Sequence, residues 1–277
     1  MNTKRMLGLV CGCTMTLSQA ANAAESEQAP AIKLNPFSRI GTSLKRSFWG
    51  GNFALQVGGI AATPVLIATG ADTKVHNFWF EHNQLSPYTV PGVVGGYFAP
   101  LLLGTSLAGY ALFADAPRTT LAANAVLQSL LVSFTYQVVL KTVTGRKAPD
   151  SVHYDDDSAS RQFQFGFLRN GIDWGWPSGV LMTNAAAVVS LAYVYPDSWL
   201  LRLAGAAYLG YLFVSAPAHE TAKLCWFSDA VAGLAMGVAI GRGVGQSLAG
   251  QGEGLLDRVA LSPMLGAGKG IVATVRF

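Results

Sequence analysis

Six long apolar segments follow one another along the chain, and each is bounded by Pro, Gly or charged residues. Because these runs are long and rich in Ala and Leu, their pattern favours helices over strands. We therefore predict an all-α fold in which six helices form a bundle. The segments are residues 53–70, 88–114, 119–140, 179–195, 200–217 and 230–241.

Two interpretations of these helices stay open, because a buried helix and a membrane span have similar patterns. A span needs about 17–25 apolar residues. Segments 88–114 and 119–140 are long enough, whereas others are short or carry polar residues such as Gln56, Thr63 and Asn184. The bundle therefore either crosses a membrane or buries its helices against one another.

The N-terminus has the pattern of an export signal. Lys4 and Arg5 precede an apolar run over 6–17, and small residues at 21–23 form a cleavage site. We expect residues 1–23 to be removed, and the protein to reside in the periplasm or cell envelope, either associated with a membrane or integral to it.

The mature chain divides into three parts by composition. A polar and basic arm covers residues 24–51, and its stretch 33–51 has the mixture of cations and aromatics typical of a surface or interfacial helix. A helical domain follows over 52–246. The tail, 247–277, alternates small, apolar and polar residues, which predicts a short β-hairpin.

The composition excludes several classes of protein. Only 12% of the 277 residues are charged and the formal net charge is +4, which excludes a disordered chain and a nucleic-acid binder with a basic surface. Without residues 1–23, Cys225 is the single cysteine, so no internal disulfide can form. His76, His82 and His153 lack metal-ligand spacing, and we expect neither a metal nor a cofactor.

Polar residues concentrate in two loops, 141–179 and 218–233, which six antiparallel helices would bring to the same end of the bundle. The residues expected to converge there are Lys141, Arg146, Ser178 and Asp229.

These loops contain the elements of an anion site. Lys141 supplies a point charge, and the amides of Ser178 and Gly179 at a helix start favour an anion. Arg146 and Lys147 lie a turn away and would add positive charge. The alternative is that Ser178 only caps the helix with its side chain.

The same loops resemble the three motifs of the type-2 phosphatidic acid phosphatase / vanadium haloperoxidase superfamily, which are Lys-x6-Arg-Pro, Pro-Ser-Gly-His and Ser-Arg-x5-His-x3-Asp. The corresponding stretches here are 141–149, 176–180 and 218–229, in the family's order and at its helix junctions. The resemblance covers roughly residues 50–245 and implies the family's six-helix bundle.

The chain departs from the family at four functional positions. By the resemblance, Cys225 stands where the family has its nucleophilic His, and Val180 stands where a second His protonates the leaving group. His219 and Ala148 replace two phosphate-clamping Arg residues.

Other parts of the family's site remain. Lys141, Ser178 and Gly179 are retained for phosphate, and Asp229 matches the Asp that orients the nucleophilic His in the family.

Loss of acid, nucleophile and clamp together predicts a pseudo-phosphatase that binds a phosphorylated lipid, phosphate or a protein partner. The alternative is an active lipid-phosphate or phosphomonoester hydrolase. In that case Cys225 would attack as a thiolate, with a pKa lowered by Lys223 and the field of the phosphate site, and His219 would serve as the acid. A structural subunit of an envelope complex is a third interpretation.

Overall fold

The computed structural model describes residues 32–169, 175–218, 225–250, 259–264 and 270–275. These residues contain eight α-helices, so the predicted all-helical class is confirmed but the expected count of six is too low. The six expected helices are all present, as α3 (Gly51–Ala68), α5 (Ser86–Phe113), α6 (Pro117–Thr144), α7 (Gly179–Val194), α8 (Trp199–Ser215) and α10 (Phe227–Ala249).

The two additional helices come from polar stretches. α2 (Ile40–Phe48) lies in the basic arm, and α4 (Ala71–Glu81) joins α3 to a short 3₁₀ helix, Asn83–Leu85. α4 buries Asp72 and His76 rather than an apolar stripe. A search for apolar runs therefore cannot find it.

The described part of the tail consists of two short strands. β1 (Val259–Met264) and β2 (Gly270–Val275) pair antiparallel, with Val259 opposite Val275 and Met264 opposite Gly270. The predicted export signal, residues 1–23, lies outside the described residues.

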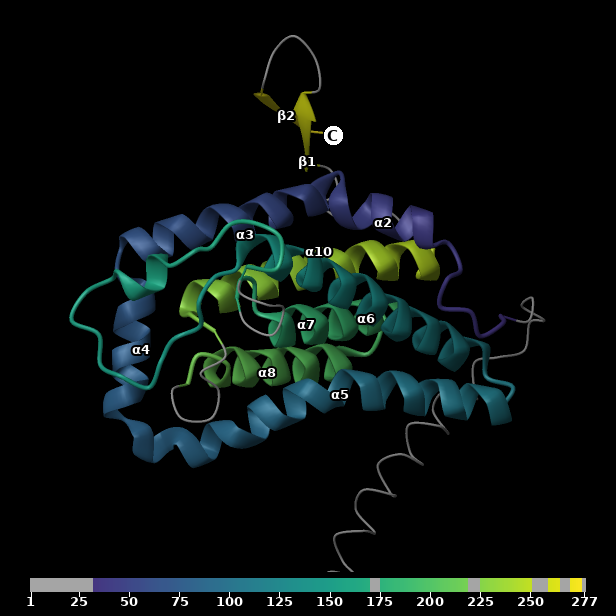
Figure 1. The fold of residues 1–277 in the computed structure, drawn as a ribbon. Helices are drawn as coiled ribbons and strands as arrows, with labels where there is room; N and C mark the ends of the chain where they lie inside the picture. The colour runs from purple at the N-terminus through teal and green to yellow at the C-terminus, as the bar shows by residue number, and fades with distance from the viewer. Residues whose placement is uncertain (1–31, 170–174, 219–224, 251–258, 265–269, 276–277) are drawn as a thin grey trace, which may run out of the picture. The chain divides into compact units, whose positions relative to one another are not determined.

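α7 occupies the middle of the helical domain and contacts α5, α6, α8 and α10 (Figure 1). Its contact with α10 is the most extensive in the domain. The interface holds a core of fully buried side chains, among them Met182 and Ala186 of α7 and Met236 and Ile240 of α10.

A row of glycines makes this close approach possible. Gly233, Gly237 and Gly241 follow one another at i, i+4 spacing along α10. A Cβ at each would lie less than 3.0 Å from a backbone carbonyl oxygen at the start or along the length of α7. Because the two backbones touch directly, α10 holds the N-terminal end of α7 in place, as small residues do between packed membrane helices.

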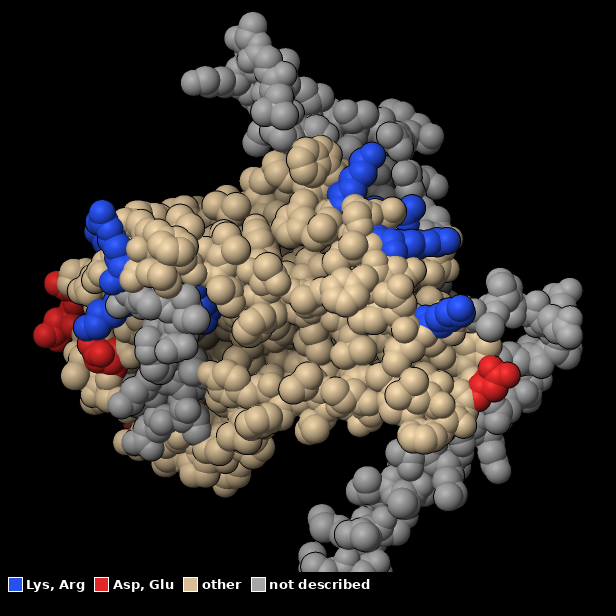
Figure 2. All heavy atoms as spheres, turned by 45° about the vertical axis from the view of Figure 1, so that its right-hand side comes forward, with Lys and Arg blue, Asp and Glu red and all other residues tan. Residues whose placement is uncertain are grey.

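Four helical segments are long and apolar enough to cross a membrane: Gly51–Ala68, Asn83–Phe113, Pro117–Thr144 and Phe227–Ala249. Large apolar side chains are also exposed on outer faces, as at Phe98 and Phe113 of α5 and Leu203 of α8. On the face that Figure 2 shows, charged side chains gather at the two ends and an uncharged band separates them. These features fit association with a membrane.

Candidate functional site

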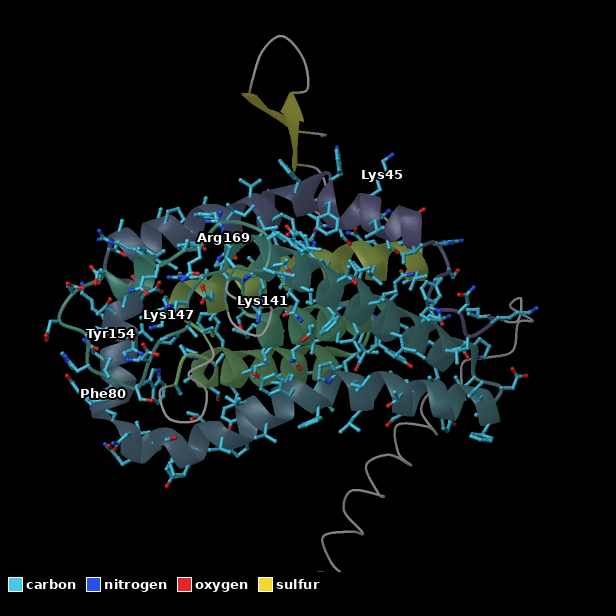
Figure 3. The ribbon with its side chains drawn as sticks, viewed as in Figure 1. Lys45, Phe80, Lys141, Lys147, Tyr154 and Arg169 are labelled. Carbon is cyan, nitrogen blue, oxygen red and sulfur yellow. The ribbon has the colours of Figure 1, made fainter. Side chains whose placement is uncertain are left out.

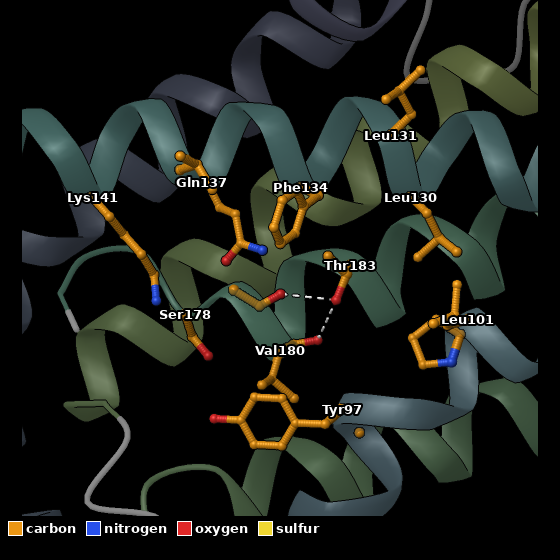
Figure 4. Close-up of a pocket in the computed structure, with 14 residues that line it drawn as sticks. Tyr97, Leu101, Leu130, Leu131, Phe134, Gln137, Lys141, Ser178, Val180 and Thr183 are labelled. Carbon is orange, nitrogen blue, oxygen red and sulfur yellow. Dashed lines mark hydrogen bonds between the residues drawn. The ribbon is translucent and has the colours of Figure 1, made fainter. Parts of the chain in front are cut away.

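A cavity of about 600 Å³ lies between α5, α6 and α7 (Figure 4). Its polar end is formed by Lys141 from the last turn of α6 and by Ser178 and Gly179 at the start of α7. The rest of its lining is mainly apolar and includes Leu101 of α5 and Phe134 of α6. The polar stretch 141–179 therefore contributes Lys141, Ser178 and Gly179 to one amphipathic cavity, whereas no described residue of the second polar loop, 218–233, lines it.

Packing between α6 and α7 fixes the geometry of the polar end. Gln137 lies one turn before Lys141, and its Oε1 occupies the space that a Cβ of Gly179 would need. A side chain at position 179 would therefore require the Gln137 amide to move away from the start of α7. In Figure 4 the side chains of Lys141 and Ser178 point toward the same space.

Ser178 is the N-cap residue of α7, but its side chain makes no capping hydrogen bond to the helix. Its hydroxyl instead interacts with the thiol of Cys225, while its backbone N–H donates to the carbonyl oxygen of Asp229 at 3.0 Å. The side-chain capping alternative is therefore not what the structure shows. The amides of the first turn of α7, beginning at Gly179 and Val180, have no helical acceptor, as at any helix start.

Arg146 does not belong to the cavity. Its side chain is fully buried and forms ion pairs with Asp72, at 2.6 Å, and with Asp229. It also donates to Ser228 Oγ at 2.8 Å and to the carbonyl oxygen of Ser160 at 2.6 and 3.1 Å. Every guanidinium nitrogen is engaged, so the expected phosphate contact of Arg146 is not available in this structure.

Asp72 is the ion-pair partner of Arg146 that the sequence did not indicate. It comes from α4, and its carboxylate also accepts from the backbone N–H and the hydroxyl of Ser228, both at 2.7 Å. Asp229 Oδ2 in turn accepts from the backbone N–H of Trp226 at 3.0 Å and so caps α10. Asp229 is thus part of a buried charge network that joins α4, α10 and the loop after α6.

Lys147, the other expected cation, also points elsewhere. Its ammonium group pairs with Asp150 at 2.7 Å, and both side chains are about half exposed. It is not among the described residues that line the cavity. Figure 3 labels both Lys141, in the last turn of α6, and Lys147, in the loop that follows α6. Of the cations proposed from sequence that lie among the described residues, Lys141 alone lines the cavity.

By the resemblance, two positions would carry catalysis, and they hold a valine and a buried cysteine. Val180 lines the cavity beside Ser178 and has no proton to give. Cys225 is 2% exposed, and its Sγ donates to the carbonyl oxygen of Ala216 at 3.7 Å.

Burial, followed by the nearby charge of Asp229, raises the pKa of the Cys225 thiol to about 12. This direction is opposite to the lowering expected from the sequence. A thiol with a raised pKa is mostly protonated at neutral pH, and a protonated thiol is a poor nucleophile. His219 was expected to serve as the acid and Lys223 to lower the pKa of the thiol. Both residues lie outside the described residues.

We expect Cys225 to resist alkylation by N-ethylmaleimide near neutral pH while the protein is folded. Mass spectrometry of the Cys225 peptide measures this, with the same protein in denaturant as the control. The raised pKa also means that the folded state loses stability as pH rises from about 9 toward 12, because the unfolded thiol ionises first. The Cys225→Ala variant should lack that loss, and equal labelling rates for the folded and unfolded chains would contradict the burial.

Residues 121–250 match the family model of the PAP2 superfamily. This stretch begins in α6 and ends just after α10, and it contains all three motif regions. The match confirms, over these residues, the resemblance that the motifs indicated. No curated protein and no solved structure matches the chain.

Proposed function

We propose that this protein is an exported, membrane-associated pseudo-phosphatase of the cell envelope, which binds an anionic lipid and does not hydrolyse it. The observation that carries the proposal is the wall of the cavity beside Lys141. Val180 stands there at the position of the family's acid, and the residue at the nucleophile position is a buried thiol.

The retained features support binding. Lys141, the first-turn amides of α7 and an apolar lining combine charge, hydrogen-bond donors and hydrocarbon contact in one cavity. A phosphorylated lipid carries the complementary groups. Hydrolysis would additionally need a nucleophile and an acid, and a well-placed acid alone contributes about 10²–10⁴-fold to the rate.

The ion pair between Asp229 and Arg146 further supports the loss of activity. In the family the matching Asp orients the nucleophilic His. Here both of its carboxylate oxygens are occupied, one by Arg146 and the other by the Trp226 amide. A side chain placed at position 225 would have to compete with these partners.

The test is phosphate release from phosphatidic acid, polyprenyl diphosphate and a chromogenic monoester by the purified full chain in detergent. We expect no turnover by the wild type and no change in Cys225→Ala. Binding is measured in parallel with Lys141→Met against the control Lys147→Met. Turnover that disappears in Cys225→Ala would establish a thiol phosphatase and overturn the proposal.

A further inference from the structure

The short helix α2 and its flanking residues expose large apolar side chains and bury small polar ones. Ser43 and Ser47 of α2 are fully buried. Phe37, Leu44 and Trp49, in contrast, are 63%, 41% and 52% exposed. A helix that packs on a protein core usually buries its apolar residues and exposes its polar ones. Here two serines are inside and three large apolar side chains are outside, which indicates that the outer surface meets something other than water.

Buried contacts fix this orientation. Gln128 of α6 donates to the carbonyl oxygens of Pro36 and Ser38 at 2.6 and 2.9 Å. The oxygen of the same amide accepts from the Ser43 hydroxyl at 2.6 Å. At the other end of α2, Phe48 packs inward against the core. The helix therefore cannot turn its exposed apolar side chains inward without breaking these contacts.

Cations accompany the exposed apolar side chains. Arg39, Lys45 and Arg46 are exposed, and residues 32–71 contain no Asp or Glu. Arg39 donates to the carbonyl oxygen of Ser247 at 3.1 Å, which holds its guanidinium beside the end of α10. In Figure 3 the side chain of Lys45 points away from the bundle. We call this region the arm surface, and it consists of Phe37, Arg39, Leu44, Lys45, Arg46 and Trp49.

The arm surface is separate from the cavity. α2 packs along the C-terminal half of α10, where the Ser47 hydroxyl donates to the carbonyl oxygen of Ile240 at 3.4 Å. The cavity instead adjoins the first turn of α10, because the Ser178 backbone N–H donates to the carbonyl oxygen of Asp229. At 1.5 Å per residue the two places lie about 15–25 Å apart along α10. A ligand in the cavity and a partner on the arm surface therefore use different residues.

The arm surface lies at the start of a helix that is able to span a membrane. α3 begins two residues after Trp49 and is one of the four helices that are long and apolar enough to cross a bilayer. Trp is enriched where spans meet water, and cations beside a span attract anionic lipids. Phospholipid offers negative charge to the cations and hydrocarbon to the apolar side chains in one place. The chemistry of the arm surface complements such a lipid.

We propose that the arm surface binds the head groups of anionic phospholipids where the bundle meets the membrane interface. Its cations pair with the negative head groups, and Phe37, Leu44 and Trp49 lie among the upper parts of the acyl chains. This contact sets the depth of the bundle in the bilayer. It goes beyond the proposed function, because it needs neither the cavity nor Lys141.

The experiment measures lipid contact at position 44 in the full chain, reconstituted into nanodiscs. Leu44→Cys carries a fluorophore in a background with Cys11→Ala, Cys13→Ala and Cys225→Ala. The quenchers are phosphatidylglycerol or phosphatidylcholine, each with a nitroxide near the head group. We expect phosphatidylglycerol to quench at least about threefold more strongly at low salt, and less so at high salt. Because the full chain is used, the charged residues of 251–258, which lie outside the described residues, contribute to the result.

Two double variants test whether the arm surface is responsible. Lys45→Gln/Arg46→Gln should abolish the preference for phosphatidylglycerol. Lys74→Gln/Arg161→Gln removes two exposed cations from α4 and from the loop after α6, and it should keep the preference. Both should bind phosphatidic acid in the cavity as the wild type does, with the dependence on Lys141 intact. Failure of this inference is thereby distinguished from failure of the proposed function.

Four results would overturn the inference. Equal quenching by the two lipids would refute the selectivity for anionic lipid. Quenching by neither lipid, with the fluorophore open to aqueous iodide, would show that the arm surface faces water. Quenching by neither lipid nor iodide would show that protein covers it. A preference that persists in Lys45→Gln/Arg46→Gln would assign its cause to another part of the chain.

Discussion

Replacing Arg146 by methionine is expected to lower the free energy of unfolding by about 3–5 kcal/mol, the usual effect of removing one partner from a buried ion pair. The variant keeps most of the side-chain volume but leaves two buried carboxylates, those of Asp72 and Asp229, without their cation. It also leaves the carbonyl oxygen of Ser160 without the guanidinium donor and removes one of the two hydrogen bonds of the Ser228 hydroxyl. Thermal and denaturant unfolding of the purified protein in detergent measure the change.

The neighbouring residue provides the matched control. Lys147 also forms an ion pair, with Asp150 at 2.7 Å, but both side chains are about half exposed. Exposed pairs contribute roughly 0–1 kcal/mol, so Lys147→Met should unfold almost as the wild type does. Equal small effects at 146 and 147 would contradict a buried network. A loss in Arg146→Lys nearly as large as that in Arg146→Met would support it, because an ammonium cannot reproduce the fork of bonds.

The second large effect is expected at Gly237, in the middle of the glycine row of α10. A Cβ there would meet the backbone carbonyl oxygen and Cα of Met182 and the side chain of Ala185, all on α7. Backbone atoms of a packed helix cannot rotate away as a flexible side chain can. Gly237→Ala should therefore separate α10 from α7 and lower stability by about 1–3 kcal/mol, as overpacking of a core does.

Gly210 of α8 is the control, since a Cβ there would have no atom within 4 Å. Gly210→Ala should leave stability unchanged or raise it by up to about 1 kcal/mol, because alanine is the better helix former. The two substitutions are chemically identical and should have opposite signs. The same sign for both would show that helix propensity, not contact between α7 and α10, determines the result. Lipid binding should weaken with Gly237→Ala alone, since α10 positions the start of α7.

Much of the helical architecture could be predicted from the sequence, because long apolar runs rich in Ala and Leu have few other ways to satisfy their backbone. All six predicted helices are present. Most of their ends shift by a few residues, but α10 continues to Ala249, well past the predicted end at 241. The motif order also indicated correctly that Lys141 and Ser178 approach each other, since both follow from helix direction and loop position. α4 was missed because its buried groups are polar.

The roles of individual charged side chains could not be predicted as well from the sequence. Arg146 was expected to face phosphate, and instead it pairs with Asp72, which lies 74 positions away in the chain. No local pattern around Asp72 indicates that contact, because the two residues meet only after α4 and the loop following α6 have packed on α10. Similarly, the sequence places Lys223 near Cys225 but does not indicate how deeply the thiol is buried.

By itself the sequence determined the helical class and the PAP2 resemblance. It also determined which residues stand at the positions that the resemblance assigns to catalysis. These properties depend on local pattern and on residue type at motif positions. Only the tertiary structure decided which cations reach the cavity and which state the thiol adopts. Charge pairing and pKa depend on neighbours and desolvation, and those are set by segments distant in the chain. Arg146 and Cys225 therefore acquired their environments from the packing of α4, α7 and α10.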